Sequence, residues 1–381
     1  MKITGIICEY NPLHLGHKKQ IDHIRAAVGA DSGIVCLMSG NFVQRGQPAI
    51  LDKMHRAKAA ILCGADLVLE LPVIYALSSA EGFAAGGVRI LSGFCDSLCF
   101  GAETAGDTLL LSTARALIDE HFPDALRKYL DAGLSFPAAR EAALGSLGYD
   151  ASILKTPNNI LAVEYCKAIL NQNSSMRPMP ILRQGSYHDS LPDPENPSAT
   201  AVRALMADSG WESYVPQEAV SCFKDAQLHT LTAGERAILM RLRTMTDSEF
   251  EILPYGSEGL WRKFMHAARK ETTVEDILTA VKSKRYTRSR LDRMLMCAYL
   301  GITAQDLVTP APYARVLAFN DRGREILKLA RNNGRFPNIG EAQTDAYQLL
   351  EDRCGDLYGL FAVGTPEPPG RERSYRVCYT P

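Results

Sequence analysis

Short apolar runs alternate with helix-like segments through the first hundred residues, and this alternation constrains the fold more than any other feature of the sequence. Segments 52–66 and 75–92 have the apolar spacing of helices. Apolar runs of strand length are residues 3–8, 33–40, 66–72, 96–103 and 178–185. Strands and helices that alternate at this pitch are typical of βαβ units. We therefore predict an α/β fold, in which a Rossmann-like parallel sheet is covered by helices on both faces.

The second half of the chain has a different pattern. From residue 210 to about 354 it is mostly helical, and an irregular, Pro-rich tail follows. A chain of 381 residues is long enough for two domains, at roughly 100 to 200 residues each. We predict that residues 1–205 form a nucleotide-binding catalytic domain and that residues 206–381 form a mainly helical domain.

Composition restricts the class and compartment of the protein. The chain has 42 Lys and Arg against 43 Asp and Glu, which excludes a basic surface over the whole molecule but not a local basic patch. Ten cysteines are scattered, and Cys95 and Cys99 lack a second pair at zinc spacing, so we expect no metal site. The N-terminus turns polar too early for a signal peptide, and no run of about 18 apolar residues occurs. We predict a reduced, cytoplasmic protein without a membrane span.

The stretch EYNPLHLGHKKQID, residues 9–22, follows the first apolar run. In an open parallel sheet, ligands bind outside the carboxyl ends of the strands, and the next helix offers free N–H groups to an anion. His14 and His17 can add donors, while Gly16 lets the backbone approach a ligand. The alternative is two surface histidines at a helix start. The position after the first strand favours a phosphate site.

Two motifs carry a family resemblance. NPLHLGH resembles the H-x-G-H signature of the nucleotidyltransferase superfamily. PSATAVR approximates the second signature of that superfamily, I-S-x-T-x-x-R, with Ser198, Thr200 and Arg203 in place and Pro197 where isoleucine is usual. Both motifs stand at a predicted helix start, where N–H groups, hydroxyls and a guanidinium suit phosphate oxygens.

The wider resemblance is to the bacterial tRNA(Met) cytidine acetate ligase family. The matching segments run from residue 3 to about 328 and include GNFVQRG and PNNIL, which ordinary adenylyltransferases lack. The resemblance implies a HUP-type nucleotidyltransferase fold. It also implies that ATP and acetate form acetyl-adenylate, which acetylates N4 of the wobble cytidine of elongator tRNA(Met). The products would be N4-acetylcytidine, AMP and diphosphate.

The resemblance also implies the residues of the site. His14, His17 and Arg203 would stabilise charge on the phosphates, with Mg2+ neutralising the rest. Whether Asn158 or Asn159 contacts ATP is left open. The implied ATP-binding residues are Ile7, Cys8, Glu9, Tyr10, Asn11, Pro12, Leu13, His14, Leu15, Gly16, His17, Lys18, Lys19, Gln20, Gly101, Asn159, Arg183, Ser198 and Thr200.

Four further polar residues have no assigned role. Asp52 stands at a predicted helix start, where it is also an ordinary partner of the helix dipole. Glu70 ends an apolar strand and could bind a ribose or a metal, or pair with a neighbouring base. His188 and Asp189 lie beside the second motif, where they could contact Mg-ATP or the cytosine amine. Near Asp52, the helix residues Lys53 and Arg56 could reach phosphates or face solvent.

A basic run, VKSKRYTRSRLDR, occupies residues 281–293. Cations concentrated on a chain of net charge −1 suit an RNA backbone, although a solvated helix face is the usual alternative. We predict that the run binds tRNA through Lys282, Lys284, Arg285, Arg288, Arg290 and Arg293.

Two rival functions remain at this stage. A small-molecule adenylyltransferase, acting on phosphopantetheine or nicotinamide mononucleotide, would need the two motifs but not the helical domain. A non-catalytic RNA-binding protein would need the basic run but not the motifs. The sequence favours an enzyme that takes ATP, acetate and tRNA(Met). It leaves open the oligomeric state, the base that accepts the amine proton, and the choice of tRNA.

Overall fold

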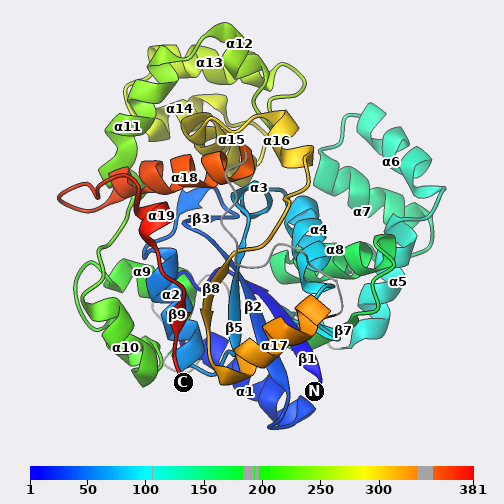
Figure 1. Cartoon of the computed structure of the whole chain (residues 1–381). Helices are drawn as coiled ribbons and strands as arrows, with labels where there is room; N and C mark the ends of the chain where they lie inside the picture. The colour runs from blue at the N-terminus through cyan, green and yellow to red at the C-terminus, as the bar shows by residue number, and fades with distance from the viewer. Residues whose placement is uncertain (105, 183–192, 194–196, 333–345) are drawn as a thin grey trace.

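The computed structural model describes residues 1–104, 106–182, 193, 197–332 and 346–381. A seven-stranded sheet runs through the molecule, and a group of helices lies beyond one end of its strands (Figure 1). The strands of the sheet are β1 (Ile3–Cys8), β2 (Gly33–Ser39), β5 (Leu67–Leu71), β6 (Ser97–Ala102), β7 (Arg177–Leu182), β8 (Val316–Phe319) and β9 (Cys378–Tyr379). A separate hairpin consists of β3 (Phe42–Val43) and β4 (Gln47–Pro48).

The order of the sheet is β7-β6-β1-β2-β5-β8-β9. From β7 to β5 all neighbours are parallel, whereas β8 runs antiparallel to β5. Ile6 in the central strand β1 pairs with Cys36 of β2 on one side and with Cys99 of β6 on the other. The chain thus builds the sheet first to one side of β1 and later to the other. In open α/β sheets this reversal opens a crevice for ligands at the carboxyl ends of the strands.

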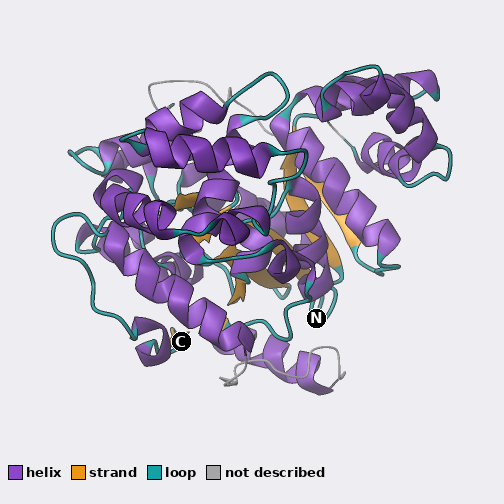
Figure 2. Cartoon of the chain, turned by 90° about the horizontal axis from the view of Figure 1, so that it is seen from above, coloured by secondary structure: helices purple, strands orange, loops and turns teal. Residues whose placement is uncertain are grey.

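Helices of the first half cover both faces of the sheet. Ile21 and Ile24 of α1 share a core with α2 and α10, whereas Phe83 of α4 and Val163 of α8 belong to the core of the opposite face. Helices α5 to α7 extend outward beside α8 (Figure 2). The helices of this part are α1 (Leu15–Val28), α2 (Lys53–Leu62), α3 (Val73–Ala76), α4 (Ala80–Leu91), α5 (Asp107–Leu117), α6 (Phe122–Asp131), α7 (Phe136–Ser146), η1 (Ala151–Lys155), α8 (Pro157–Asn171), α9 (Ala199–Leu205), η2 (Trp211–Tyr214) and α10 (Gln217–Lys224).

Helices α11 to α16 lie over the carboxyl ends of the strands (Figure 1). The hydroxyl of Tyr255 donates to the carbonyl of Leu77 at 2.7 Å, which ties this group to the segment after α3. The helices of the second half are α11 (Leu231–Thr244), α12 (Asp247–Glu251), α13 (Leu260–Lys270), α14 (Val274–Val281), α15 (Arg288–Leu300), α16 (Ala304–Val308), α17 (Asp321–Asn332), α18 (Ala346–Tyr358), η3 (Gly359–Phe361) and α19 (Arg371–Ser374).

The α/β prediction is confirmed, with a strand in each of the five predicted runs. All seven residues of β2 are buried, as expected for a strand covered on both faces. The helix predicted at 75–92 is confirmed over Ala80–Leu91 but is interrupted before it, because α4 starts after Ser79, whose Oγ accepts the N–H of Gly82 at 3.3 Å. Strands β8 and β9 come from the region predicted to be mainly helical, so C-terminal residues complete the sheet. The division at residue 205 remains a prediction.

The cysteines of the chain are free thiols. Burial raises the pKa of Cys99 and Cys297 to about 12, so both stay protonated at neutral pH and serve as small apolar groups. Across the ranges given above, no helix is both long and apolar enough to cross a membrane.

The tail, predicted to be irregular, instead enters the protein interior through Glu372. This residue of α19 is buried, and its carboxylate contacts the ammonium group of Lys53 and the guanidinium group of Arg315. Lys53 also donates to both carboxylate oxygens of Glu70, at 2.7 and 2.9 Å. Partners 319 positions apart leave no local signal in the sequence, so the burial of Glu372 could not be predicted from it.

Removal of Glu372 tests whether this cluster holds the tail. We expect Glu372→Ala to lower the free energy of unfolding by about 3 kcal/mol, because it leaves buried cations without one of their carboxylates. The control on the same helix is Arg373→Ala, since Arg373 is exposed and its pair with Asp352 contributes about 0–1 kcal/mol. Urea unfolding followed by circular dichroism measures both. Equal losses for the two variants would contradict the account.

Candidate functional site

The turn between β1 and α1 places both histidines at the start of α1. His14 is the N-cap residue, and its Nδ1 accepts the N–H of Gly16 at 3.1 Å. The main-chain N–H of His14 donates to Nδ1 of His17 at 3.2 Å, which completes a capping box. Because Nδ1 of each neutral ring accepts a hydrogen bond, the ring proton lies on Nε2. Each histidine therefore carries an N–H donor on the side of its ring away from the capping bond.

The two imidazole rings are stacked, with their centroids 3.7 Å apart. Tyr10 packs edge-on against His17, at a centroid distance of 5.0 Å. A Cβ atom on Gly16 would lie 3.1 Å from Cε1 of His14, so glycine leaves the room that this ring occupies. The paired Nε2–H groups and the partial positive charge of the helix start suit an anion with several oxygen atoms.

The second motif lies against the first. Ser198 caps α9 by accepting the N–H of Ala201 at 3.1 Å. Arg203 of the same helix donates to the main-chain carbonyl of Asn11 at 2.7 Å and to Oγ1 of Thr200 at 3.1 Å. Residues 192 positions apart are thus in contact, and the guanidinium group of Arg203 lies at the turn that holds the histidines.

Glu9 lies in the same turn and is surrounded by cations. Its Oε1 accepts the main-chain N–H of Gln44 at 2.7 Å. Burial raises the pKa of Glu9, and the Gln44 bond and nearby arginines, Arg203, Arg45 and Arg56, oppose that rise. Positive charge therefore lies near the carboxyl end of β1, where Arg203, in contact with the histidine turn, favours an anionic ligand.

Arg56 is fully buried and binds main-chain carbonyls rather than a ligand. Its Nη1 donates to the carbonyls of Glu9 at 2.6 Å and Ser39 at 3.1 Å, and its Nε donates to Leu51 at 2.9 Å. Its Nη2 donates to the carbonyl of Gly40. The phosphate contact considered for Arg56 is therefore wrong, because the side chain points into the protein and joins the ends of β1 and β2.

The loop after β6 is held by the first turn of α8. Oδ1 of Asn159 accepts the N–H groups of Glu103 at 2.9 Å and Thr104 at 3.2 Å. The carboxylate of Glu103 accepts hydrogen bonds from Asn158 at 2.5 Å and from the main chain of Asn159 at 2.8 Å. Both asparagines thus position the segment that follows Gly101. Sequence reasoning missed Glu103, although it is the last residue of the predicted strand run 96–103.

The structure gives Asp52 and Glu70, whose roles the sequence left open, contacts within the protein. Asp52 is the N-cap of α2 and accepts the N–H of Met54 at 2.8 Å. Glu70 pairs with Lys53. The side chain of Lys53 is buried, so it does not face solvent, one of the two positions considered for it from the sequence. The residues outside the described ranges are Arg183, His188 and Asp189.

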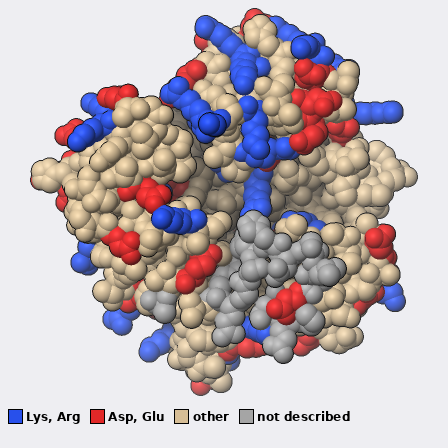
Figure 3. All heavy atoms as spheres, turned by 180° about the vertical axis from the view of Figure 1, so that it is seen from behind, with Lys and Arg blue, Asp and Glu red and all other residues tan. Residues whose placement is uncertain are grey.

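The basic run does not form one continuous helix. α14 ends at Val281 and α15 begins at Arg288, so residues 282–287 form the connection between them. Lys282, Lys284 and Arg285 are exposed on this connection. On the rear face of the molecule, Lys and Arg side chains form a band beside a hollow in the surface (Figure 3).

The arginines of α15 make internal contacts. Arg288 forms two hydrogen bonds of 2.7 Å with the carboxylate of Glu275. Arg290 donates to the carbonyl of Tyr255 at 2.8 Å, and Arg293 lies over the Tyr255 ring at 5.1 Å. These contacts assign the three arginines a part in packing α15. On the connection, Arg285 pairs with Glu258 at 2.9 Å. Binding of tRNA by the basic run stays a prediction.

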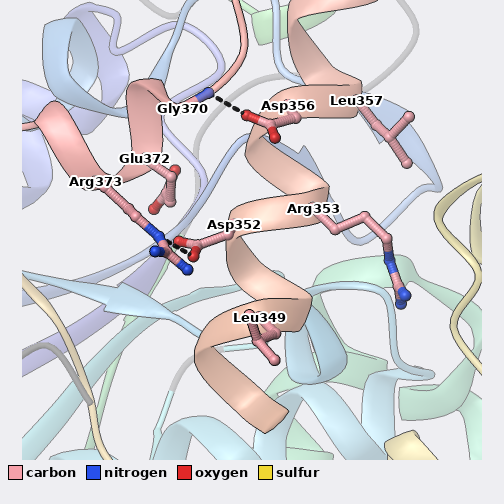
Figure 4. A pocket seen from close by; sticks show the side chains of 8 residues that line it. All are labelled: Leu349, Asp352, Arg353, Asp356, Leu357, Gly370, Glu372 and Arg373. Atoms are coloured by element: carbon pink, nitrogen blue, oxygen red, sulfur yellow. Dashed lines mark hydrogen bonds and ion pairs between the residues drawn. The ribbon is translucent and has the colours of Figure 1, made fainter. Parts of the chain in front are cut away.

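A cavity of about 370 Å3 lies between α18 and α19, and no residue of the β1–α1 turn lines it (Figure 4). Arg373 pairs with Asp352 at 2.6 Å, and Asp356 accepts the N–H of Gly370 at 2.6 Å (Figure 4). The other two charged side chains of the lining bind groups outside it, because Glu372 pairs with Lys53 and Arg315, and Arg353 donates to the carbonyl of Gly301.

Among the residues that the structure describes, side chains suited to a metal do not gather at the histidines. Within the part of the chain that the structure describes, no group of three His, Cys, Asp or Glu residues could hold a metal ion. A magnesium ion at this site would depend mainly on phosphate oxygens and water for its ligands, as Mg2+ commonly does.

Residues 1–366 match the sequence profile described as HIGH Nucleotidyl Transferase. Two curated proteins named tRNA(Met) cytidine acetate ligase are similar to this chain. That of Clostridium tetani is 38% identical over 94% of this chain and 96% of its own length. That of Clostridium novyi is 38% identical over 88% of this chain and 89% of its own length.

Two crystal structures of Thermotoga maritima TmcAL are similar over the whole chain. The apo form has a TM-score of 0.91 and 30% sequence identity, covering 100% of this chain and 99% of that one. The form bound with alpha-thio ATP has a TM-score of 0.88 and 29% identity over the same shares of the two chains.

A substitution at Arg56 tests the scaffold of the site. We expect Arg56→Lys to lower the free energy of unfolding by about 3 kcal/mol, because a lysine cannot bind four separate carbonyls and leaves some of them unpaired. The control is Lys58→Ala, an exposed position on the same helix, with an expected change within about 0.5 kcal/mol. Chemical unfolding measures both, and an Arg56→Lys variant as stable as the control would contradict the role of Arg56.

Proposed function

The chain belongs to the HIGH nucleotidyl transferase family and, within it, to the tRNA(Met) cytidine acetate ligases, and from this membership we propose that it acetylates the wobble cytidine of elongator tRNA(Met). The observation that carries the proposal is the contact of Arg203 with the Asn11 carbonyl, because it joins two phosphate-binding helix starts at one strand end. The names of the relatives support the substrate, and the ligand of the Thermotoga structure supports ATP. A cytoplasmic location follows from such a substrate.

The first half-reaction activates acetate. A carboxylate oxygen of acetate attacks the α-phosphorus of ATP, the bond from that phosphorus to the diphosphate breaks, and acetyl-adenylate forms. The Nε2–H groups of His14 and His17, the start of α1 and Arg203 stabilise the charge that develops on the phosphate oxygens. Mg2+ enters with ATP as part of the substrate and neutralises further charge.

The second half-reaction transfers the acetyl group. The N4 amine of cytidine attacks the acetyl carbon, the bond to the AMP oxygen breaks, and the amine loses one proton as N4-acetylcytidine and AMP form. The protein acts mainly by holding the two reactants in position. Arg183, which lies outside the described ranges, stays a proposed ATP contact, as do Gly101, Asn159, Ser198, Thr200 and the other residues of the 7–20 segment.

Transfer of labelled acetate tests the proposal directly. The protein is incubated with ATP, Mg2+ and [14C]acetate, with and without tRNA(Met), and label is counted in the RNA. We expect label in tRNA(Met) only when ATP is present. Unlabelled tRNA together with adenylyl transfer to phosphopantetheine or nicotinamide mononucleotide would favour a small-molecule adenylyltransferase. Binding of tRNA without either reaction would favour an RNA-binding protein.

Two substitutions separate the proposed charge stabilisation by the histidines from their role in capping α1. His14→Asn keeps an N-cap acceptor, and His17→Gln keeps an acceptor at the third helix position, but both lose the imidazole Nε2–H. We expect each variant to slow acetate-dependent exchange of diphosphate into ATP about 100-fold. His23→Asn, at an exposed position of the same helix, is the control. Near-normal exchange in both variants would exclude the proposed charge stabilisation.

The exposed connection before α15 provides a test of RNA binding. We expect alanine at Lys282, Lys284 and Arg285 to weaken tRNA affinity and to make its logarithmic salt dependence about 2 units less steep, because fewer counterions are released. The control removes the same charge from the amino edge of the sheet, at the exposed residues Lys2, Arg89 and Arg177. Filter binding at several salt concentrations measures both triple variants. The same salt dependence in both would remove the connection from the RNA surface.

A further inference from the structure

The β3–β4 hairpin connects the β1–α1 turn to α15, the helix that follows the 282–287 connection. The peptide groups of Gln44, in the hairpin turn, are held from two sides. Its N–H donates to the carboxylate of Glu9 at 2.7 Å, and its carbonyl accepts from Nη1 of Arg293 at 3.3 Å. Glu9 belongs to the turn after β1, whereas Arg293 belongs to α15. One residue of the hairpin therefore bridges the β1–α1 turn and α15.

Gly46 fixes the other side of the hairpin turn. Its φ angle is +72°, a conformation that side chains other than glycine rarely adopt. A Cβ atom here would lie 2.4 Å from the carbonyl carbon of Asp292, so the turn packs directly on the backbone of α15. Main-chain atoms cannot move aside as a flexible side chain can. Arg45, between Gln44 and Gly46, thus has its backbone anchored by both neighbours.

Three arginines act on Glu9, and Arg45 differs from the other two in its exposure. Arg56 is buried and donates to main-chain carbonyls of four residues. Arg203 is half-buried and donates to Asn11 and Thr200. Arg45 is exposed at the tip of the hairpin. It is the member of this group that an incoming macromolecule can reach.

We propose that Arg45 binds a phosphate group of the RNA strand beside the cytidine that receives the acetyl group, and so positions that base for transfer. The proposal rests on the proposed function and adds a residue to it. The cytidine must bring its N4 amine to an acetyl group bound near the β1–α1 turn, so its flanking phosphates pass close to that turn, to which the hairpin is hydrogen-bonded. A guanidinium fork on a fixed backbone suits this task, because it can donate two hydrogen bonds to one phosphate.

Arg45→Ala separates this role from nucleotide binding. We expect the kcat/KM for acetylation of tRNA to fall about 150-fold, the loss that two charge-assisted hydrogen bonds at the lower end of their usual strength would give. Acetate-dependent diphosphate exchange without tRNA should stay within twofold of wild type. Arg45→Lys keeps the charge but not the fork, so its kcat/KM for acetylation of tRNA should lie between those of the wild type and of Arg45→Ala. Arg89→Ala is the control, since Arg89 is exposed in the last turn of α4, at the opposite edge of the sheet.

Each other outcome overturns the inference in its own way. A parallel fall in diphosphate exchange would assign Arg45 to the nucleotide, and unchanged acetylation would give it no role. A thermal unfolding midpoint lowered in Arg45→Ala but not in Arg89→Ala would make the residue structural. Wild-type protein that exchanges diphosphate but never labels tRNA would refute the proposed function itself, a result distinct from any effect of Arg45.

Discussion

The guanidinium group of Arg56 is the interaction on which the functional part of this molecule depends. It binds the carbonyl that follows β1 and two carbonyls at the end of β2, in the interior of the protein. The histidine turn starts from the first of these strand ends, and the β3–β4 hairpin starts from the second. A cation with several fixed donors can satisfy carbonyls that converge from different segments, which one ammonium group cannot do. Arg56 therefore fixes the main-chain positions from which both the β1–α1 turn and the hairpin start.

Around this scaffold, the chain brings together positive charge from segments far apart in the sequence. The helix start at His14, the guanidinium of Arg203 and the exposed Arg45 all lie near the carboxyl end of β1, where the sheet order reverses. An overall charge near zero is compatible with such a site, because the cations are concentrated rather than numerous. Before α15, Lys282, Lys284 and Arg285 are exposed, whereas Arg288 and Arg290 within α15 bind other parts of the protein.

The sequence predicted what depends on local pattern. Apolar runs of strand length gave the parallel sheet, and a histidine pair directly after the first run located the helix start. Contacts between distant segments could not be predicted in this way. The burial of Glu372 against Lys53 and the return of β8 to β5 depend on partners hundreds of residues away. The basic run was recognised, but composition alone did not distinguish exposed Lys284 from Arg288, which is paired with Glu275.

We propose that the crevice at the carboxyl ends of β1 and β6 holds the triphosphate between the two motifs. The most direct measurement is a crystal structure of this chain with Mg2+ and a non-hydrolysable ATP analogue. The account predicts phosphate oxygens within hydrogen-bond distance of Nε2 of His14 and His17, with the nucleotide beside Gly101. A nucleotide bound elsewhere, for example in the cavity between α18 and α19, would contradict it.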